Sequence, residues 1–124
     1  MDYDKNIAAL FLLNLGEAYR SAKHLLSSHE RLARLMPLSA ERLAQLGVDD
    51  LEMLDAFRVR YCDLQDSLGN KTFRSLLKLE EEQPGSNLDT LNKMEKRSII
   101  YSFDEWKELR DIRNLFSHDY PETY

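Results

Sequence analysis

The chain has 124 residues, of which 43% are hydrophobic and 31% charged, and its net charge is −5. This length suits a single domain spanning 1–124, and the composition is typical of a folded globular protein. The 4 glycines and 3 prolines allow few turns, which disfavours an all-β fold and predicts an all-α bundle of a few long helices. The acidic balance excludes binding of nucleic acid through a generally basic surface, although a small basic site is compatible with it.

Three features predict a reduced, cytoplasmic protein with no membrane partner. Cys62 is the single cysteine, so no disulfide can form within the chain. The first four residues carry no basic region of the kind that opens a signal peptide. The longest uncharged apolar run, Ile7 to Leu15, is too short to span a bilayer.

Apolar residues recur at spacings of three and four from about residue 4 to about residue 35, which predicts a long first helix. Its first half is apolar nearly all round, so we expect it to be covered on more than one side, by the bundle and, as one option, also by a second subunit. Pro37 should end this helix. Ser39 should then cap a short helix over 40–46, which Gly47 ends.

A second long helix is predicted after a capping box formed by Asp49 and Glu52, with apolar residues at alternating spacings of three and four up to Leu68. Gly69 and Asn70 should bend or interrupt it before the pattern resumes as far as Glu82. The segment 83–87 is the clearest loop.

Three shorter elements follow. Ser86 and Asp89 form a further capping arrangement at the start of a short helix. The run 99–101 is expected to be an extended connector whose apolar side chains dock on the bundle. A last capping box, from Ser102 to Glu105, places the final helix at about 103–118, and Pro121 limits its continuation.

The final helix concentrates residues suited to phosphate chemistry. At 100° per residue, Leu109, Ile112 and Phe116 share the side predicted to face the core, with Trp106 at its margin. Another side carries Arg110, Asn114, Ser117 and His118, and Arg113 lies on the border. Arg110, Asn114 and His118 are successive i, i+4 neighbours and can act on one ligand. An arginine fork, an amide and an imidazole are groups that metal-free RNA cleavage requires.

The ordinary alternative is that His118 and the arginines only complement the negative end of the helix dipole, and on composition alone this alternative is favoured. The chemistry also needs a second acid or base, which a second copy of the helix across a two-fold axis would supply most economically. His24 and His29 have no partner at metal-ligand spacing and are read as surface residues. The sequence therefore predicts no metal and no cofactor.

The segment Arg113-Asn114-Leu-Phe-Ser-His118-Asp-Tyr120 resembles the Arg-x4-His-x-Tyr motif of HEPN-domain toxins, in particular the HepT branch that is paired with a minimal nucleotidyltransferase antitoxin. The resemblance extends over nearly the whole chain. The segment 57–69 is similar to the central helix of the family, and 91–110 is similar to its approach to the motif.

The resemblance implies an up-and-down helical bundle of about five helices that forms a two-fold homodimer with one composite cleft. It further implies a metal-independent endoribonuclease toxin of a type VII-like toxin–antitoxin pair, acting on cellular RNA, with tRNA as one candidate. Arg113 would stabilise the scissile phosphate, His118 would act as general base or acid, and Asn114 would position substrate or His118. Tyr120 would receive AMP from the antitoxin, which silences the nuclease.

Three further residues, Arg110, Arg60 and Asp66, are supporting candidates for the cleft. Their ordinary reading, which spacing alone favours for Arg60 and Asp66, is a solvated helix face with local ion pairs. Two other functions stay open. The chain could be a non-catalytic subunit that binds substrate for a nucleotidyltransferase, or a purely structural helical adaptor.

Overall fold

The computed structural model describes residues 5–118, and within that range it describes the backbone alone at 117 and 118. All regular structure in these residues is helical, and they contain no strand. The elements are α1 (Lys5–Leu32), η1 (Ala33–Leu35, a 3-10 turn), α2 (Ala40–Ala44), α3 (Val48–Asp66), η2 (Ser67–Thr72, a π-helical turn), α4 (Phe73–Leu79), α5 (Asn87–Lys96) and α6 (Phe103–His118). Because α3, η2 and α4 form one continuous rod, the predicted all-α fold of about five helices is confirmed.

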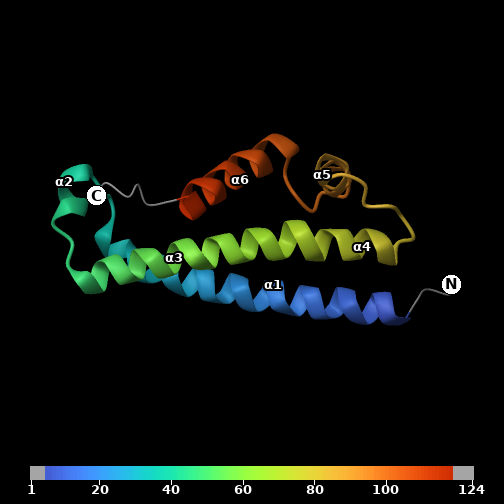
Figure 1. Cartoon of the computed structure of the whole chain (residues 1–124), viewed down its shortest axis with the longest axis horizontal. Coiled ribbons are helices and arrows are strands. Elements are labelled where there is room, and N and C mark those ends of the chain that lie inside the picture. The colour runs from blue at the N-terminus through green and yellow to red at the C-terminus, as the bar shows by residue number, and fades with distance from the viewer. Residues whose placement is uncertain (1–4, 119–124) are drawn as a thin grey trace.

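The long rod made by α3, η2 and α4 is the centre of the molecule (Figure 1). Helix α1 runs beside it along most of its length, and α6 packs on α3 from another side. Arg60 of α3 reaches α1, whereas Tyr61 of the same helix reaches α6. Consecutive residues of a helix point about 100° apart, so α3 separates α1 from α6.

The most deeply buried cluster lies at the end of the rod where α4 meets α5. Phe73, Leu77, Met94 and Ile100 form it. Trp106, in the first turns of α6, packs on this cluster, with its ring centroid 5.2 Å from that of Phe73. The start of α6 is therefore fixed by the core. The later turns of the helix lie along α3.

The segment between α1 and α3 follows the predicted capping in part. Ser39 caps α2, its Oγ accepting a hydrogen bond of 3.0 Å from the backbone N–H of Arg42. The capping box at Asp49 is wrong, because Gly47 is the N-cap of α3 and Asp49 lies inside the first turn. Asp50 instead forms an ion pair with Arg34, at 2.7 Å, which ties the start of α3 to the 3-10 turn η1 that follows α1.

The helix changes at Gly69 and Asn70, as predicted, but it does not break. The rod continues through the wider π-helical turn η2 and resumes as α4. It ends at Leu79, earlier than the predicted Glu82, because Glu81 adopts a left-handed φ of 63°. The loop after it is as expected, and Ser86 and Asp89 form a complete capping box at the start of α5.

The connector before α6 docks only in part. Ile100 is buried in the core, whereas Tyr101 is 85% exposed. Ser102 accepts a hydrogen bond from the backbone N–H of Glu105, at 3.0 Å, as the third predicted cap requires. Helix α6 then covers the predicted range.

Helix α1 presents a second apolar face that α3 does not cover. Its inner face, which includes Asn14, Ala18, Ser28 and Leu32, is buried. Another face, with alternating spacings of four and three, carries Ala8, Leu12, Leu15, Tyr19, Ala22 and Leu26. Leu12, Tyr19 and Leu26 are each more than 60% exposed. The predicted burial of α1 on several sides is therefore not met within one chain. No helix among the described residues is long and apolar enough to cross a membrane.

Candidate active site at the junction of helices α3 and α6

Asp66, the last residue of α3, lies between two arginines of α6. Its carboxylate accepts hydrogen bonds from Arg113 Nε at 3.0 Å and from Arg113 Nη2 at 2.6 Å, so this pair is bidentate. Arg110 Nη1 donates to the same carboxylate at 2.7 Å. Two cations thus share one anion on a partly exposed surface.

The inward face of α6 explains this placement. The partly buried side chains of α6 include a stripe spaced by three, four and three residues: Trp106, Leu109, Arg113 and Phe116. Phe103 and Arg110, which are also partly buried, flank this stripe. Arg113 is therefore inside this stripe, not at its border, and Ile112 is 40% exposed, so its prediction as a core anchor is wrong. A guanidinium can occupy an inward position here because Asp66 supplies the opposite charge.

Two side chains of α3 hold α6 through its backbone. The Tyr61 hydroxyl donates to the carbonyl oxygen of Leu109 at 2.8 Å. Arg58 donates to the carbonyl oxygen of Phe116 with Nη2. The Tyr61 and Phe116 rings meet edge to face, 5.3 Å apart, next to Phe57.

Sequence periodicity placed Tyr61 on the apolar face of its helix, but nothing in the pattern indicated which carbonyl its hydroxyl would reach. The same holds for Arg58. Both residues act on the position of α6 and thereby on the placement of Arg113.

The charges of the junction are fixed at neutral pH. The hydrogen bond from Arg113 is the main reason that the pKa of Asp66 lies below its ordinary value, and Arg110 adds to the effect. The same bond raises the pKa of Arg113. With Asp66 ionised and both arginines protonated, the junction carries a surplus of positive charge in an acidic protein.

Cys62 lies beside Asp66 and Arg113, but it does not supply a nucleophile to the site. Its thiol approaches the carbonyl oxygen of Arg113 at 3.6 Å. Burial raises the pKa of the thiol, with the nearby Arg113 acting in the opposite direction. Cys62 is therefore protonated at neutral pH, and the thiolate that nucleophilic chemistry needs is scarce.

The other predicted site residues are placed as follows. Asn114 lies on the exposed side of α6, one residue after Arg113. His118 is the last residue of α6, and its backbone continues the same helix. Arg60 is separate from the group, because its Nη1 donates to the carbonyl oxygen of His24 on α1, at 3.3 Å. Tyr120 lies outside the described residues.

The structure thus brings together Arg110, Asp66 and Arg113, with Asn114 and the backbone of His118 on the same helix. Among the side chains that the structure describes, those of residues 5–116, no three or more His, Cys, Asp or Glu are grouped as metal ligands would be. Comparison with known proteins finds no matching protein family, no matching curated protein and no matching solved structure.

Proposed function

We propose that the chain is a HEPN-type ribonuclease toxin of the HepT branch, which cleaves RNA with the Arg-x4-His motif of α6. The observation that carries the proposal is the fixed position of Arg113. Its guanidinium is oriented by Asp66 and lies beside that of Arg110, on the helix that ends at His118. A preorganised arginine is the group that stabilises extra negative charge on phosphorus.

The chemistry follows from the groups on α6. His118 takes the proton from a ribose 2′-hydroxyl, or gives one to the leaving oxygen, because an imidazole changes charge near neutral pH. Arg113 neutralises the phosphorane-like transition state. Asn114, on the exposed side between these two, orients the substrate or the imidazole. Each helix supplies one histidine, so the second acid or base comes from a partner copy.

A two-fold homodimer is part of the proposal. The outer side of α6 carries Leu115, which is 74% exposed, and Ile112. Both lie close in sequence to Asn114 and His118, so pairing through this side would bring these two positions of each copy to one cleft, while Arg113 stays on the inward face of α6. Burial of exposed leucine side chains supplies the driving force for such pairing.

Regulation follows from the same motif. A nucleotidyltransferase antitoxin transfers AMP from ATP to the hydroxyl of Tyr120, two residues after His118, and pyrophosphate is the leaving group. The added nucleotide is a bulky anion beside groups that receive an RNA phosphate, so repulsion and steric exclusion act together.

The test is cleavage of RNA by the purified chain in EDTA. His118→Ala should abolish cleavage while leaving the helical content and unfolding midpoint unchanged. His29→Ala is the matched control, because His29 is an exposed histidine of α1. Full activity of the His118→Ala protein would overturn the assignment.

The pairing of Arg113 with Asp66 favours a second candidate function in which Arg113 has only a structural role, that of a non-catalytic subunit that binds substrate for a nucleotidyltransferase. Asp66 occupies Nε and Nη2 of Arg113, which is also what a purely structural clamp would require. Intact mass after co-expression with a nucleotidyltransferase separates the two. A gain in steps of one AMP that is lost in Tyr120→Phe supports the toxin, and an unchanged mass supports the binding subunit.

A further inference from the structure

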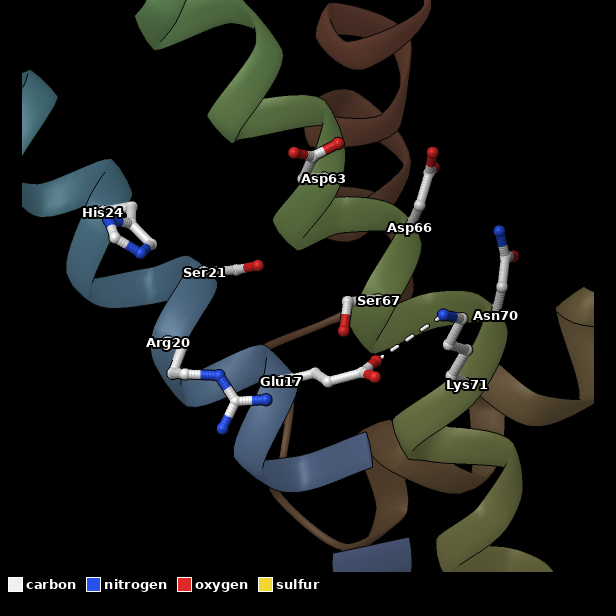
Figure 2. A pocket seen from close by; sticks show the side chains of 9 residues that line it. All are labelled: Glu17, Arg20, Ser21, His24, Asp63, Asp66, Ser67, Asn70 and Lys71. Carbon is white, nitrogen blue, oxygen red and sulfur yellow. Dashed lines mark ion pairs between the residues drawn. The ribbon is translucent and has the colours of Figure 1, made fainter. Parts of the chain in front are cut away.

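A polar groove of about 480 Å³ lies between α1 and the rod, at the junction of α3 and η2. Figure 2 shows Glu17 and Arg20 projecting from α1 and Asp66, Ser67 and Lys71 from the opposite wall. This volume is in the range of pockets that hold a small organic ligand. Asp66 lines the groove and also binds Arg113. The groove therefore shares Asp66 with the candidate active site.

The wider turn η2 brings an unsatisfied polar group to this place. Ser67 is 9% exposed, and its hydroxyl oxygen has no hydrogen-bond partner in the described structure. Figure 2 places its side chain at the floor of the groove, between the two walls. Buried hydroxyls are nearly always hydrogen-bonded, and π-helical turns often occur at functional sites. An orphan hydroxyl at this turn indicates a ligand that supplies the missing bond.

The charges around the groove fit a phosphate-bearing ligand. Glu17 is paired with Lys71, at 3.6 Å across the opening, and this pair is exposed enough to exchange partners. Arg20 lies on the other side of Glu17 (Figure 2). Asp63 is the remaining acidic residue of the lining. Asp66 is already paired with Arg110 and Arg113, which lie outside the lining. The other charges of the groove are Arg20 and Lys71 against Glu17 and Asp63.

We propose that this groove binds the ribose and phosphate of a nucleotide that adjoins the cleaved bond in a single-stranded RNA substrate. Arg20 and Lys71 hold the phosphate, and the Ser67 hydroxyl bonds to a ribose hydroxyl once the exposed Glu17 side chain moves aside. The 2′-hydroxyl is the feature that separates RNA from DNA at such a contact. This inference rests on the proposed ribonuclease function, because the groove shares Asp66 with that site.

The experiment measures binding of a fluorescein-labelled RNA 10-mer, and of DNA of the same sequence, to the full chain carrying His118→Ala, in EDTA. Adding Arg20→Gln or Lys71→Gln should weaken RNA binding about fivefold and reduce the magnitude of the salt slope by about 1. Lys78→Gln is the matched control, since Lys78 is an exposed lysine of α4 outside the groove. Ser67→Ala should reduce the preference for RNA over DNA without lowering the unfolding midpoint, because it removes an unsatisfied buried hydroxyl.

Measuring RNA cleavage by the chain with its native His118 distinguishes the proposed nuclease from the proposed groove. If RNA is cleaved but Arg20→Gln and Lys71→Gln bind as the Lys78→Gln control does, the groove is wrong and the nuclease stands. If binding depends on Arg20 and Lys71 but no RNA is cleaved, the groove stands as an RNA-binding site, and both the nuclease and the position of the groove beside a cleaved bond are wrong. Absence of any RNA binding by the His118→Ala protein overturns the groove.

Discussion

Asp66 and Arg113 form a bidentate ion pair across the junction of α3 and α6, with the shorter hydrogen bond at 2.6 Å. The pair joins the end of the central rod to the motif helix. Arg113 belongs to the inward stripe of α6, so its ion pair with Asp66 is a packing contact. The same pair orients the guanidinium of Arg113. Its loss should therefore appear both in stability and in activity.

The pH dependence of stability tests the pair directly. The pKa of Asp66 is below its ordinary value of 3.8 in the folded chain, so the folded state gains stability from the ionised carboxylate. That gain is complete above the unfolded pKa and is lost as the pH falls through the lower, folded value. Asp66→Asn should lower the free energy of unfolding by about 1 kcal/mol at pH 7, a small value because the carboxylate is partly exposed. Urea unfolding from pH 7 to pH 2 should show this difference shrinking below about pH 4; a constant difference would contradict the assignment.

Arg113→Lys and Arg110→Lys should differ in effect, although both keep a positive charge. Lysine cannot reproduce the fork by which Arg113 binds both oxygens of Asp66, whereas Arg110 makes a single hydrogen bond that an ammonium can replace. We expect Arg113→Lys to reduce kcat/KM for RNA roughly a hundredfold, as loss of a preorganised donor does, and Arg110→Lys to reduce it only a few-fold. Steady-state cleavage of one labelled RNA measures both. Equal losses would show that Arg113 acts only as a charge.

The sequence predicts the starts of α2, α5 and α6 well because each of them is marked locally. Ser39, Ser86 and Ser102 accept hydrogen bonds at the starts of α2, α5 and α6, and such caps depend on residues only three positions apart. It places Arg113 less well, because a helical wheel ranks positions by apolarity and assigns a charged residue to the border. The true direction of Arg113 depends on Asp66, which is 47 positions away.

The groove between α1 and the rod could not be predicted from the sequence either, because it also depends on contacts between residues far apart in the chain. A glycine followed by asparagine predicted a disturbance in the rod near residue 69, and the disturbance is present as η2. Whether a helix bends, breaks or widens depends on the packing of α1 against it. In the structure, Ser67 at the start of this widened turn lies in the wall opposite Arg20.

Leu115→Glu tests the proposed dimer. Leu115 is the most exposed apolar side chain of α6, so a charge there should prevent pairing through the motif helices and yield a monomer in sedimentation velocity. Leu12→Glu is the matched control, since Leu12 is 65% exposed on α1, which α3 separates from α6. RNA cleavage should be lost with Leu115→Glu and kept with Leu12→Glu. A dimer broken by Leu12→Glu alone would rule out a composite cleft between two copies of α6.

Tyr61→Phe tests how far the backbone of α6 depends on its anchor in α3. The change removes only the hydroxyl that donates to the carbonyl oxygen of Leu109, while the edge-to-face contact with Phe116 is retained. We expect the free energy of unfolding to fall by about 1 kcal/mol, the usual net value of such a bond. Amide hydrogen exchange should speed up in α6 more than in α1, because α6 loses a hydrogen bond and α1 does not. Tyr101→Phe is the matched control, since Tyr101 is 85% exposed and should leave both measurements unchanged. Equal effects of the two changes would show that the Tyr61 hydroxyl does not hold the motif helix.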